Sequence, residues 1–333
     1  MSFIEDSWYR DNGWTKLLNP LSLVYGRVAK KRRDTFLSKQ ADLWQPPVPV
    51  VVVGNISVGG TGKTPVTLAL IEYFKSLGYK PGVISRGYGG KAPSYPYEVL
   101  SASSAAHSGD EPLLIKQRTN CCVVVDPDRV AAAKYLLSVA DCDLIISDDG
   151  LQHYALLRHI ELAVVDGERG LGNGRLLPAG PLRESAQRLI EVDFVLVNGG
   201  QWSYPAGETN RFRLIASRFI NVKTGDTKTV NQWAGASCHA VAGIGNPQRF
   251  FNTLAELKIT IKTQKALPDH HKITEHELIF NDELPVLVTE KDAVKCRDFA
   301  NDKLWYLSVD AQLPAKFLSQ LKLTLDQLRD QTL

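Results

Sequence analysis

The chain has 333 residues, 44% of them apolar and 23% charged, which is typical of a folded protein of two domains. Its net charge of +3 is too small for a basic surface over the whole molecule, so we expect no nucleic-acid partner. The sequence has no apolar run of about 18 residues and no signal-peptide pattern, which argues against a membrane span and against export by that route. Its five cysteines contain no CxxC pair, which argues against a disulfide framework or a zinc site and for a reducing cytoplasm.

The first 45 residues differ in style from the rest of the chain. Aromatic and leucine side chains are interleaved there with a basic cluster at 30–33. One interpretation is a helical arm that packs on the core with a solvated basic end. The other is an interfacial segment whose apolar side chains enter the lipid headgroup boundary while its cations meet anionic lipid. The residues alone leave both interpretations open.

From residue 48 the pattern becomes that of an α/β protein. The β-branched run 48–54 is typical of a strand buried on both faces of a parallel sheet. Strands that alternate with helices predict a doubly wound, mostly parallel sheet. We expect a helix at 128–139 and further strands at 82–85, 121–125, 143–147, 160–165 and 192–197.

The segment GNISVGGTGKTP, residues 54–65, joins the first strand to the helix that follows it. It matches a phosphate-binding loop except that Ser57 stands where the pattern has its first glycine. Inward-facing backbone N–H groups, the Lys63 charge and the Thr64 hydroxyl are what nucleotide phosphates and Mg²⁺ require. The loop predicts a nucleotide site made of Asn55, Ser57, Gly59, Gly60, Thr61, Gly62, Lys63 and Thr64.

A second motif, DLIISDDGLQH at 143–153, ends an apolar strand with two aspartates. Adjacent carboxylates at a strand end repel each other unless a cation lies near. Asp148 is therefore our expected metal ligand beside the loop, directly or through water, with Asp149 close to the same charge.

Three further motifs have a structural interpretation beside the functional one. Asp110 and Glu111 start an apolar helix, as capping residues often do. Arg86 follows the second strand, where α/β ligands bind, but a surface turn explains it equally well. Arg183 and Glu184 end a long Gly/Pro loop that either lines the site or merely connects.

Two motifs lie in the last third of the chain. His270 and His271 are adjacent, but no third ligand stands at a recognisable spacing, so we reject a zinc site. Thr289 and Asp292 fit a helix capping box, and that structural interpretation suffices for them. The predicted organisation is an arm over 1–45, a P-loop core domain over 46–200, a connecting region of weak periodicity over 201–234 and a smaller C-terminal α/β domain over 235–333.

Taken together, seven motifs resemble one family closely, tetraacyldisaccharide 4'-kinase, the lipid A 4'-kinase. They run in order to about residue 295 and are GNISVGGTGKTP, SRGYGG, SGDEP, DDGLQH, GRLLPAGPLRE, PDHH and VTEKDAVK. The family's loop is similar to this one, with serine at the position of Ser57. The resemblance implies transfer of the γ-phosphate of ATP, with Mg²⁺, to the 4'-hydroxyl of a tetraacylated glucosamine disaccharide 1-phosphate in lipid A biosynthesis.

The resemblance also implies where such a protein works and how it is built. It implies two α/β/α domains with the nucleotide site between them, and an N-terminal helix that contacts the membrane. We expect a monomer, bound peripherally to the cytoplasmic face of the bacterial inner membrane, with a glycolipid as its substrate. A substrate with four acyl chains must be met at the bilayer surface, which favours the interfacial interpretation of the arm.

The family's catalytic residues match positions of this sequence. Lys63 and Thr64 match the loop lysine and threonine, Asp110 matches the catalytic aspartate, and its paired histidine matches His270, with His271 as the alternative register.

The paired aspartates of the family match Asp148 and Asp149, and an acidic residue near the nucleotide matches Glu184; which of the three binds Mg²⁺ directly stays open. We add Arg86, Tyr88 and Arg183 as expected substrate-binding residues. Two other functions remain alternatives: a P-loop kinase for a soluble metabolite, and a membrane-associated ATPase switch.

Overall fold

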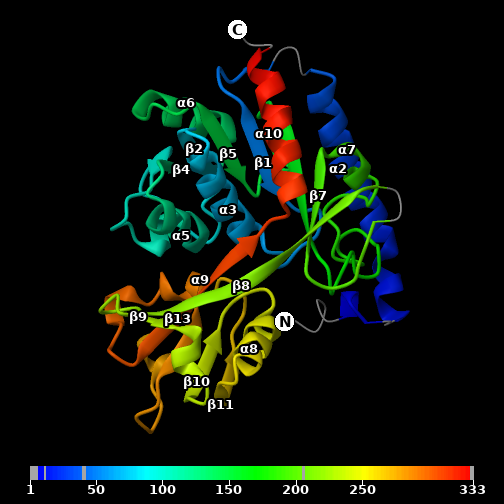
Figure 1. Cartoon of the computed structure of the whole chain (residues 1–333). Helices are drawn as coiled ribbons and strands as arrows, with labels where there is room; N and C mark the ends of the chain where they lie inside the picture. The colour runs from blue at the N-terminus through cyan, green and yellow to red at the C-terminus, as the bar shows by residue number, and fades with distance from the viewer. Residues whose placement is uncertain (1–6, 11–12, 40–42, 205–206, 331–333) are drawn as a thin grey trace.

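The computed structural model describes residues 7–10, 13–39, 43–204 and 207–330 (Figure 1). Two α/β lobes lie one above the other in this view, and one long strand runs from one to the other. The strands are hydrogen-bonded in the order β11-β10-β12-β13-β8-β7-β6-β1-β5-β2-β4-β3, with β9 beside β8. We call the part built on β1 to β7 the first lobe and the part built on β10 to β13 the second lobe.

The sheet of the first lobe confirms the predicted doubly wound, mostly parallel arrangement. Its neighbouring strands are parallel, except for the short antiparallel β3 at the edge. The strands are β1 (Val50–Gly54), β2 (Pro81–Ser85), β3 (Tyr97–Glu98), β4 (Val123–Val125), β5 (Leu144–Asp148), β6 (Ile160–Asp166) and β7 (Phe194–Asn198). Strand β1 lies between β5 and β6, so the loop that follows it opens beside the ends of both.

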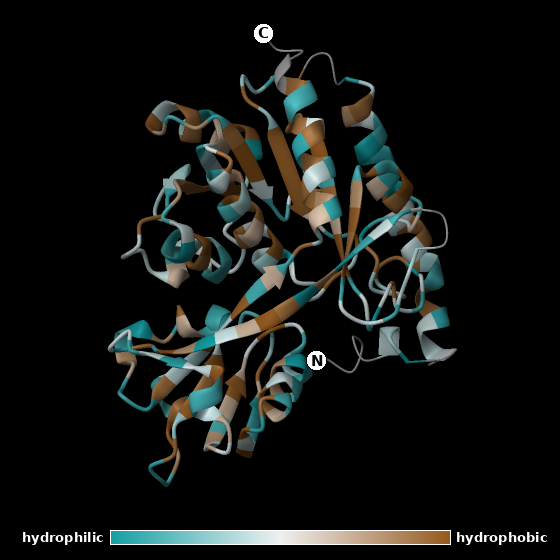
Figure 2. Cartoon of the chain, in the orientation of Figure 1, coloured by the Kyte–Doolittle hydropathy of each residue, from teal (hydrophilic) through white to brown (hydrophobic). Residues whose placement is uncertain are grey.

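Helices cover both faces of this sheet, and the strands between them are strongly hydrophobic (Figure 2). Val51 and Val53 pack in one core with α3, while Val50 and Val52 pack in the other with α6. This is why the β-branched run has no polar alternation. The helices of the lobe are α3 (Lys63–Ser76), α4 (Ala105–Ser108), α5 (Asp110–Thr119), α6 (Arg129–Val139) and α7 (Arg188–Glu191).

The connecting region is more regular than its weak periodicity indicated. Strand β8 (Thr209–Asn221) pairs in parallel with β7 through its first residues and antiparallel with β13 through the rest. The short β9 (Thr227–Thr229) pairs with its end. The first half of β8 buries Asn210 and Phe212, and the second half buries Phe219 and Asn221. The buried face therefore changes along the strand, and no single alternation runs through all of it.

The second lobe is a smaller α/β unit, as predicted for the last part of the chain. It contains β10 (Ser237–Ala242), α8 (Pro247–Glu256), β11 (Thr260–Ala266), β12 (Val286–Thr289), α9 (Glu290–Ala293) and β13 (Leu304–Gln312), with 3-10 helices η3 (Val230–Trp233), η4 (Glu275–Leu278) and η5 (Arg297–Phe299). The last helix, α10 (Ala315–Asp330), leaves this lobe: Phe317, Leu321 and Leu325 lie in the core of the first lobe. A simple division after residue 234 therefore does not describe the packing of α10.

The N-terminal arm is a 3-10 helix, η1 (Gly13–Leu18), followed by α2 (Asn19–Leu37). Polar contacts attach it to the first lobe: the Ser22 hydroxyl donates to the Leu176 carbonyl at 2.9 Å, the Trp8 indole donates to the Pro178 carbonyl at 3.1 Å, and Arg33 pairs with Glu191. Among the described residues, no helix is long and apolar enough to cross a membrane.

Candidate active site

The phosphate-binding loop lies at the carboxyl end of β1, and two glycines give it its shape. Gly59 and Gly62 both have φ of 100°, a conformation that favours glycine, and Gly62 directly precedes α3. The Asn198 amide at the end of β7 donates to the Thr61 carbonyl at 3.1 Å. Ser57 is buried and bridges to Leu182 without a positive φ. Glycine is therefore not required at Ser57, which explains why the loop departs from the standard pattern there.

Asp148 lies beside this loop with an unsatisfied carboxylate. Its side chain is fully buried, Oδ1 accepts a hydrogen bond from Thr67 at 3.3 Å, and Oδ2 has no partner. Burial, together with the charges of Glu111 and Asp149, raises the pKa of Asp148 to about 7. A buried carboxylate oxygen without a donor is suited to a cation, and carboxylate and hydroxyl oxygens are ligands that Mg²⁺ prefers. The residues at this position fit Mg²⁺.

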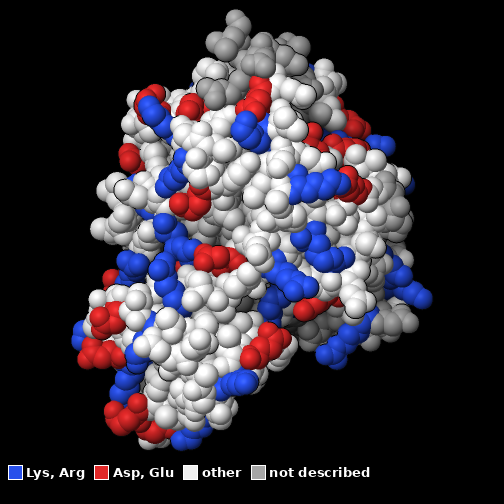
Figure 3. All heavy atoms as spheres, viewed as in Figure 1, with Lys and Arg blue, Asp and Glu red and all other residues white. Residues whose placement is uncertain are grey.

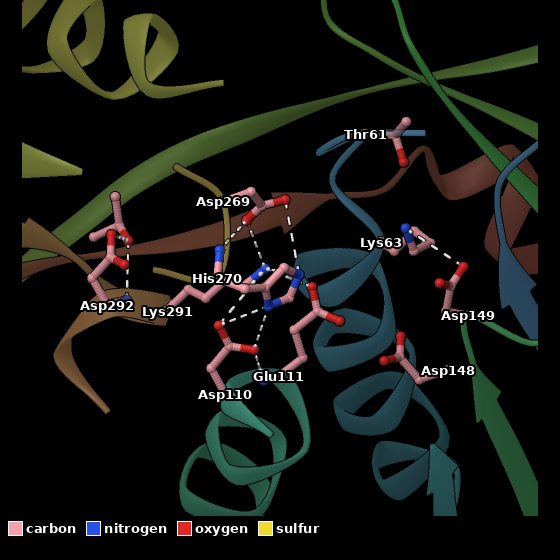
Figure 4. Close-up of polar contacts among 12 residues, drawn as sticks. Thr61, Lys63, Asp110, Glu111, Asp148, Asp149, Asp269, His270, Lys291 and Asp292 are labelled. Carbon is pink, nitrogen blue, oxygen red and sulfur yellow. Dashed lines mark hydrogen bonds and ion pairs between the residues drawn. The ribbon is translucent and has the colours of Figure 1, made fainter. Parts of the chain in front are cut away.

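Asp149 contacts two cations at the edge of the loop, and Figure 4 shows the first of them, Lys63. Its Oδ1 is 3.6 Å from the Lys63 ammonium, and both of its oxygens are 3.2 Å from Nη1 of Arg183. Burial alone would raise the pKa of Asp149, but Lys63 and Arg183 outweigh burial and hold it well below its usual range. Asp149 is therefore a permanent anion that orients Lys63 and Arg183.

Glu184 belongs to a network next to these residues. It accepts hydrogen bonds from Gln152 at 2.8 Å and from the Tyr154 hydroxyl. Gln152 also donates to the Asn55 carbonyl at 3.1 Å, which links Glu184 to the start of the loop. The long Gly/Pro loop that carries Arg183 and Glu184 thus lines the site, and a role for Glu184 in metal binding stays a prediction.

Asp110 and His270 meet across the two lobes. Asp110 is the first residue of α5 and is 5% exposed, and His270 Nδ1 is 3.2 Å from both of its oxygens. His271 turns away and contacts Glu277 at 2.9 Å, so the pair is made by His270. Burial would raise the pKa of Asp110, but the His270 hydrogen bond and the charges of Lys291 and Lys295 lower it. Asp110 is therefore a carboxylate at neutral pH.

The second lobe also reaches the loop itself. A Cβ atom on Gly245 would lie 2.5 Å from the Gly60 nitrogen, so only glycine allows this close approach. Arg249 of α8 binds Asp166 at the end of β6 at 2.9 Å, and Arg118 of α5 binds Glu290 of α9 at 2.8 Å. Figure 3 shows basic and acidic side chains along the junction of the lobes. Ion pairs and close backbone contact therefore join the lobes around the site.

Comparisons with known proteins agree with this architecture. A family model described as tetraacyldisaccharide-1-P 4'-kinase matches residues 14–326. The chain belongs to this family. A curated relative from Pseudomonas syringae, named tetraacyldisaccharide 4'-kinase, is 50% identical over 307 residues, which are 92% of each chain. A relative of the same name from Ectopseudomonas mendocina is 50% identical over 97% of this chain and 96% of its own.

A solved structure shows the same fold at lower identity. The crystal structure of LpxK from Aquifex aeolicus, which is described as a complex with ATP, matches with a TM-score of 0.78 and 24% identity, over 94% of this chain and 99% of that one. The tetraacyldisaccharide-1-P 4'-kinase fold is therefore present in this chain from the arm to α10.

Two lysines that the sequence motifs did not indicate as site residues lie beside Asp110. Thr289 does cap α9, since its hydroxyl accepts the Asp292 N–H at 3.1 Å, as the capping box predicted. That capped turn presents Lys291, whose ammonium is 3.0 Å from Glu111 and 3.9 Å from Asp110, and Lys295 follows at 3.8 Å from Asp110. The motif VTEKDAVK contains both lysines, but the capping interpretation of this motif explains only Thr289 and Asp292 and gives the lysines no role.

A buried arginine near Arg86 was also missed. Arg129 is 2% exposed, and its Nε and Nη2 have no hydrogen-bond partner. The pKa of Arg129 is lowered to about 10, mainly by burial and also by the charge of Arg86. The charges of Asp148 and Asp149 act in the opposite direction and raise it. Arg86 itself is exposed. Tyr88, which is 60% exposed, packs its ring edge-on against His270 with 4.7 Å between the ring centroids.

Proposed function

We propose that this protein is an ATP-dependent kinase that transfers the γ-phosphate of ATP to the 4'-hydroxyl of tetraacyldisaccharide 1-phosphate. The family match supports the reaction, and one observation carries its assignment to this site. The Asp110–His270 pair, made from both lobes, stands at the same junction as the phosphate-binding loop. A base beside a phosphate cradle is what transfer to a sugar hydroxyl requires.

In the proposed mechanism, the loop N–H groups and Lys63 bind the phosphates of ATP. Asp110 accepts the proton of the sugar hydroxyl as the bond from its oxygen to the γ-phosphorus forms and the bond from that phosphorus to the bridging oxygen breaks, which releases ADP. Asp149 keeps Lys63 and Arg183 oriented toward the phosphates. Thr64 and Asp148, with Glu184 as a further candidate, would hold Mg²⁺, which when bound neutralises charge on the phosphate oxygens.

Arg86 and Arg129 are suited to an anionic group of the substrate. The free guanidinium nitrogens of Arg129 are buried, and an unsatisfied buried donor is costly unless a ligand accepts from it. A phosphate accepts several such hydrogen bonds at once. We therefore assign Arg86 to the 1-phosphate of the glycolipid or a phosphate of ATP, with Arg129 behind it and Tyr88 at the exposed rim.

The arm presents the features expected of a peripheral membrane anchor. Four of its large exposed apolar side chains recur at the spacing i, i+4, i+7 and i+11: Leu17 in η1 and Leu21, Val24 and Val28 in α2. Leu23 and Leu37 are exposed elsewhere on the arm. A neighbouring basic face carries Arg27, Lys30 and Lys31. Each CH₂ kept out of water is worth about 0.8 kcal/mol, so an enzyme that reaches only the sugar while the acyl chains stay in the bilayer avoids a prohibitive cost. We place it at the cytoplasmic face of the inner membrane.

The arm can be tested with vesicles that contain anionic lipid. The double variant Lys30→Gln/Lys31→Gln is expected to partition onto such vesicles roughly thirtyfold more weakly, because each lysine near an anionic surface is worth about 1 kcal/mol. The double variant Leu21→Gln/Val28→Gln is expected to bind weakly at any salt concentration. Co-sedimentation measures both. Arg33→Gln is the control, since Arg33 is engaged with Glu191 and its loss should lower stability but leave vesicle binding intact. If both double variants bind the vesicles as well as the unmodified protein does, the arm is a helix that packs on the core and not a membrane anchor.

The function itself is tested with labelled ATP and a total glycolipid extract. Transfer of label to tetraacyldisaccharide 1-phosphate in detergent or lipid is the expected result. Label found only on a water-soluble acceptor would identify a metabolite kinase instead. Release of inorganic phosphate without any labelled acceptor would identify an ATPase switch.

A further inference from the structure

We infer that Lys291 is a positioning residue that holds His270 as the neutral tautomer with its proton on Nδ1, so that the imidazole donates to Asp110 and does not take over its proton. This inference rests on the proposed function for its catalytic meaning, but not for its geometry. It concerns a cluster in which both lobes take part and which Figure 4 shows around the His270 ring.

The tautomer follows from what each nitrogen contacts. The Lys291 ammonium lies 3.3 Å from His270 Nε2, and an ammonium has donors but no lone pair. Nε2 must therefore be the bare, accepting nitrogen, which leaves the single ring proton on Nδ1. Nδ1 faces both oxygens of Asp110 at 3.2 Å, where a donor is needed because a carboxylate only accepts.

Lys291 has a competitor for this nitrogen. Asp269 Oδ2 lies 3.8 Å from His270 Nε2 and only accepts hydrogen bonds. If Lys291 were absent, a proton on Nε2 would face Asp269 while a proton on Nδ1 faced Asp110. The ring would then be a cation between two carboxylates, which is the arrangement that Lys291 prevents.

The surroundings keep the Lys291 ammonium charged and in place. Its side chain is 16% exposed and also binds Glu111 at 3.0 Å and Asp269 at 3.3 Å. Burial would lower the pKa of Lys291, but Glu111, Asp110 and Asp269 raise it above its usual range.

The remaining groups that face the pair come from elements packed on it. Lys295 is 3.8 Å from Asp110 and binds Asp292 at 2.6 Å and the His271 carbonyl at 3.2 Å. Tyr88 covers the ring edge-on.

This arrangement decides the path of the proton. When Asp110 takes the proton of the attacking hydroxyl, Nδ1 already carries a hydrogen and has no lone pair to receive another. The proton therefore stays on the Asp110 carboxyl until the product leaves, and His270 acts by orienting the carboxylate. An imidazolium in the same place would make Asp110 a weaker base.

Nitrogen NMR of the whole protein tests the tautomer without ATP or acceptor. Long-range ring ¹H–¹⁵N spectra of ¹⁵N-labelled protein at pH 7.5, with His270 assigned by its absence from His270→Gln, are expected to show a protonated Nδ1 and a bare Nε2. Free histidine prefers the opposite tautomer, so this result is diagnostic. A wild-type ring with a protonated Nε2, neutral or cationic, would overturn the inference even if no variant of Lys291 folds.

Variants then show whether Lys291 is the cause. In Lys291→Met we expect the Nε2 signal to become that of a protonated nitrogen facing Asp269. We also expect the acidic limb of the kcat profile to move to higher pH, because Asp110 loses a cation that lowers its pKa. Lys291→Arg should restore the bare Nε2. Lys295→Met is the matched control, because it removes the other cation near Asp110 and leaves the Nε2 contact. Spectra and profile unchanged in Lys291→Met would reject the assignment.

The spectra test the role of Lys291 and the kinase assay tests the proposed function, so the two hypotheses can be rejected independently. If the spectra show the expected tautomer but the protein does not phosphorylate the glycolipid, this inference holds and only the proposed acceptor is rejected. Transfer to the glycolipid with a protonated Nε2 leaves the function standing and removes the role of Lys291.

Discussion

Lys63→Ala is expected to slow phosphoryl transfer by at least about a hundredfold, or about 3 kcal/mol of transition-state stabilisation, with saturating Mg-ATP. The physical reason is that transfer of a phosphoryl group depends on positioned charge more than on covalent chemistry. Lys63 begins α3 directly behind the loop, and Asp149 holds its ammonium at 3.6 Å. The measurement is the single-turnover rate with labelled ATP and glycolipid.

A matched control uses the same helix and the same substitution. Lys75 lies at the far end of α3, where it contacts Glu72 and the Thr119 carbonyl, so Lys75→Ala should keep near-native turnover. Near-native turnover in Lys63→Ala would instead show that the loop lysine does not act on the phosphates.

Asp148→Asn separates a metal role from a structural one at the same site. We expect a loss of similar size in rate, together with an unchanged or higher Tm of the metal-free protein at pH 8. The sign follows from the raised pKa of Asp148: above pH 7 the folded protein holds a buried, half-unpaired carboxylate, which the neutral amide relieves. Asp143→Asn, in the turn before β5, is the control for stability. A lower Tm with native turnover would make Asp148 a structural residue.

The second large effect is expected at the pair that spans the lobes. Asp110→Ala should reduce kcat by about 10²- to 10⁴-fold, the usual contribution of a general base. If Asp110 and His270 act as one unit, the double Ala variant should lose little more than the worse single variant. The measurement is a double-mutant cycle: the initial rates of the unmodified protein, the two single variants and the double variant at saturating ATP and glycolipid.

Additive losses in the logarithm of kcat would show that the two residues act independently. A third possibility is that Asp110 only caps its helix, but its carboxylate accepts the adjacent Glu111 N–H, and Gly109 occupies the capping position. Asp128 does cap α6, since it accepts from the Val130 and Ala131 N–H groups. Asp128→Ala should therefore cost about 1 kcal/mol of stability without changing kcat, and the same behaviour in Asp110→Ala would remove the base.

Local patterns determined much of the architecture. The run 50–53 predicts a doubly buried strand because valine suits both faces of a parallel sheet, and the structure confirms it. The loop at 54–64 is equally local, because strand, glycines and helix follow one another within a few residues and leave the backbone little choice. The motif order indicated the family in the same way.

The tertiary structure alone decided which partners meet. His270 and His271 are chemically identical neighbours, and the choice between them depends on a loop that returns to Asp110 from 160 residues away, with His270 at φ of 57°. Lys291 stands in a segment that a capping box explains, but its ammonium lies 3.0 Å from Glu111 of the other lobe. The periodicity of β8 is divided between two partners, and α10 packs in a core formed far away in the chain. A single sequence records which side chains prefer burial or charge, but not which distant ones they will face.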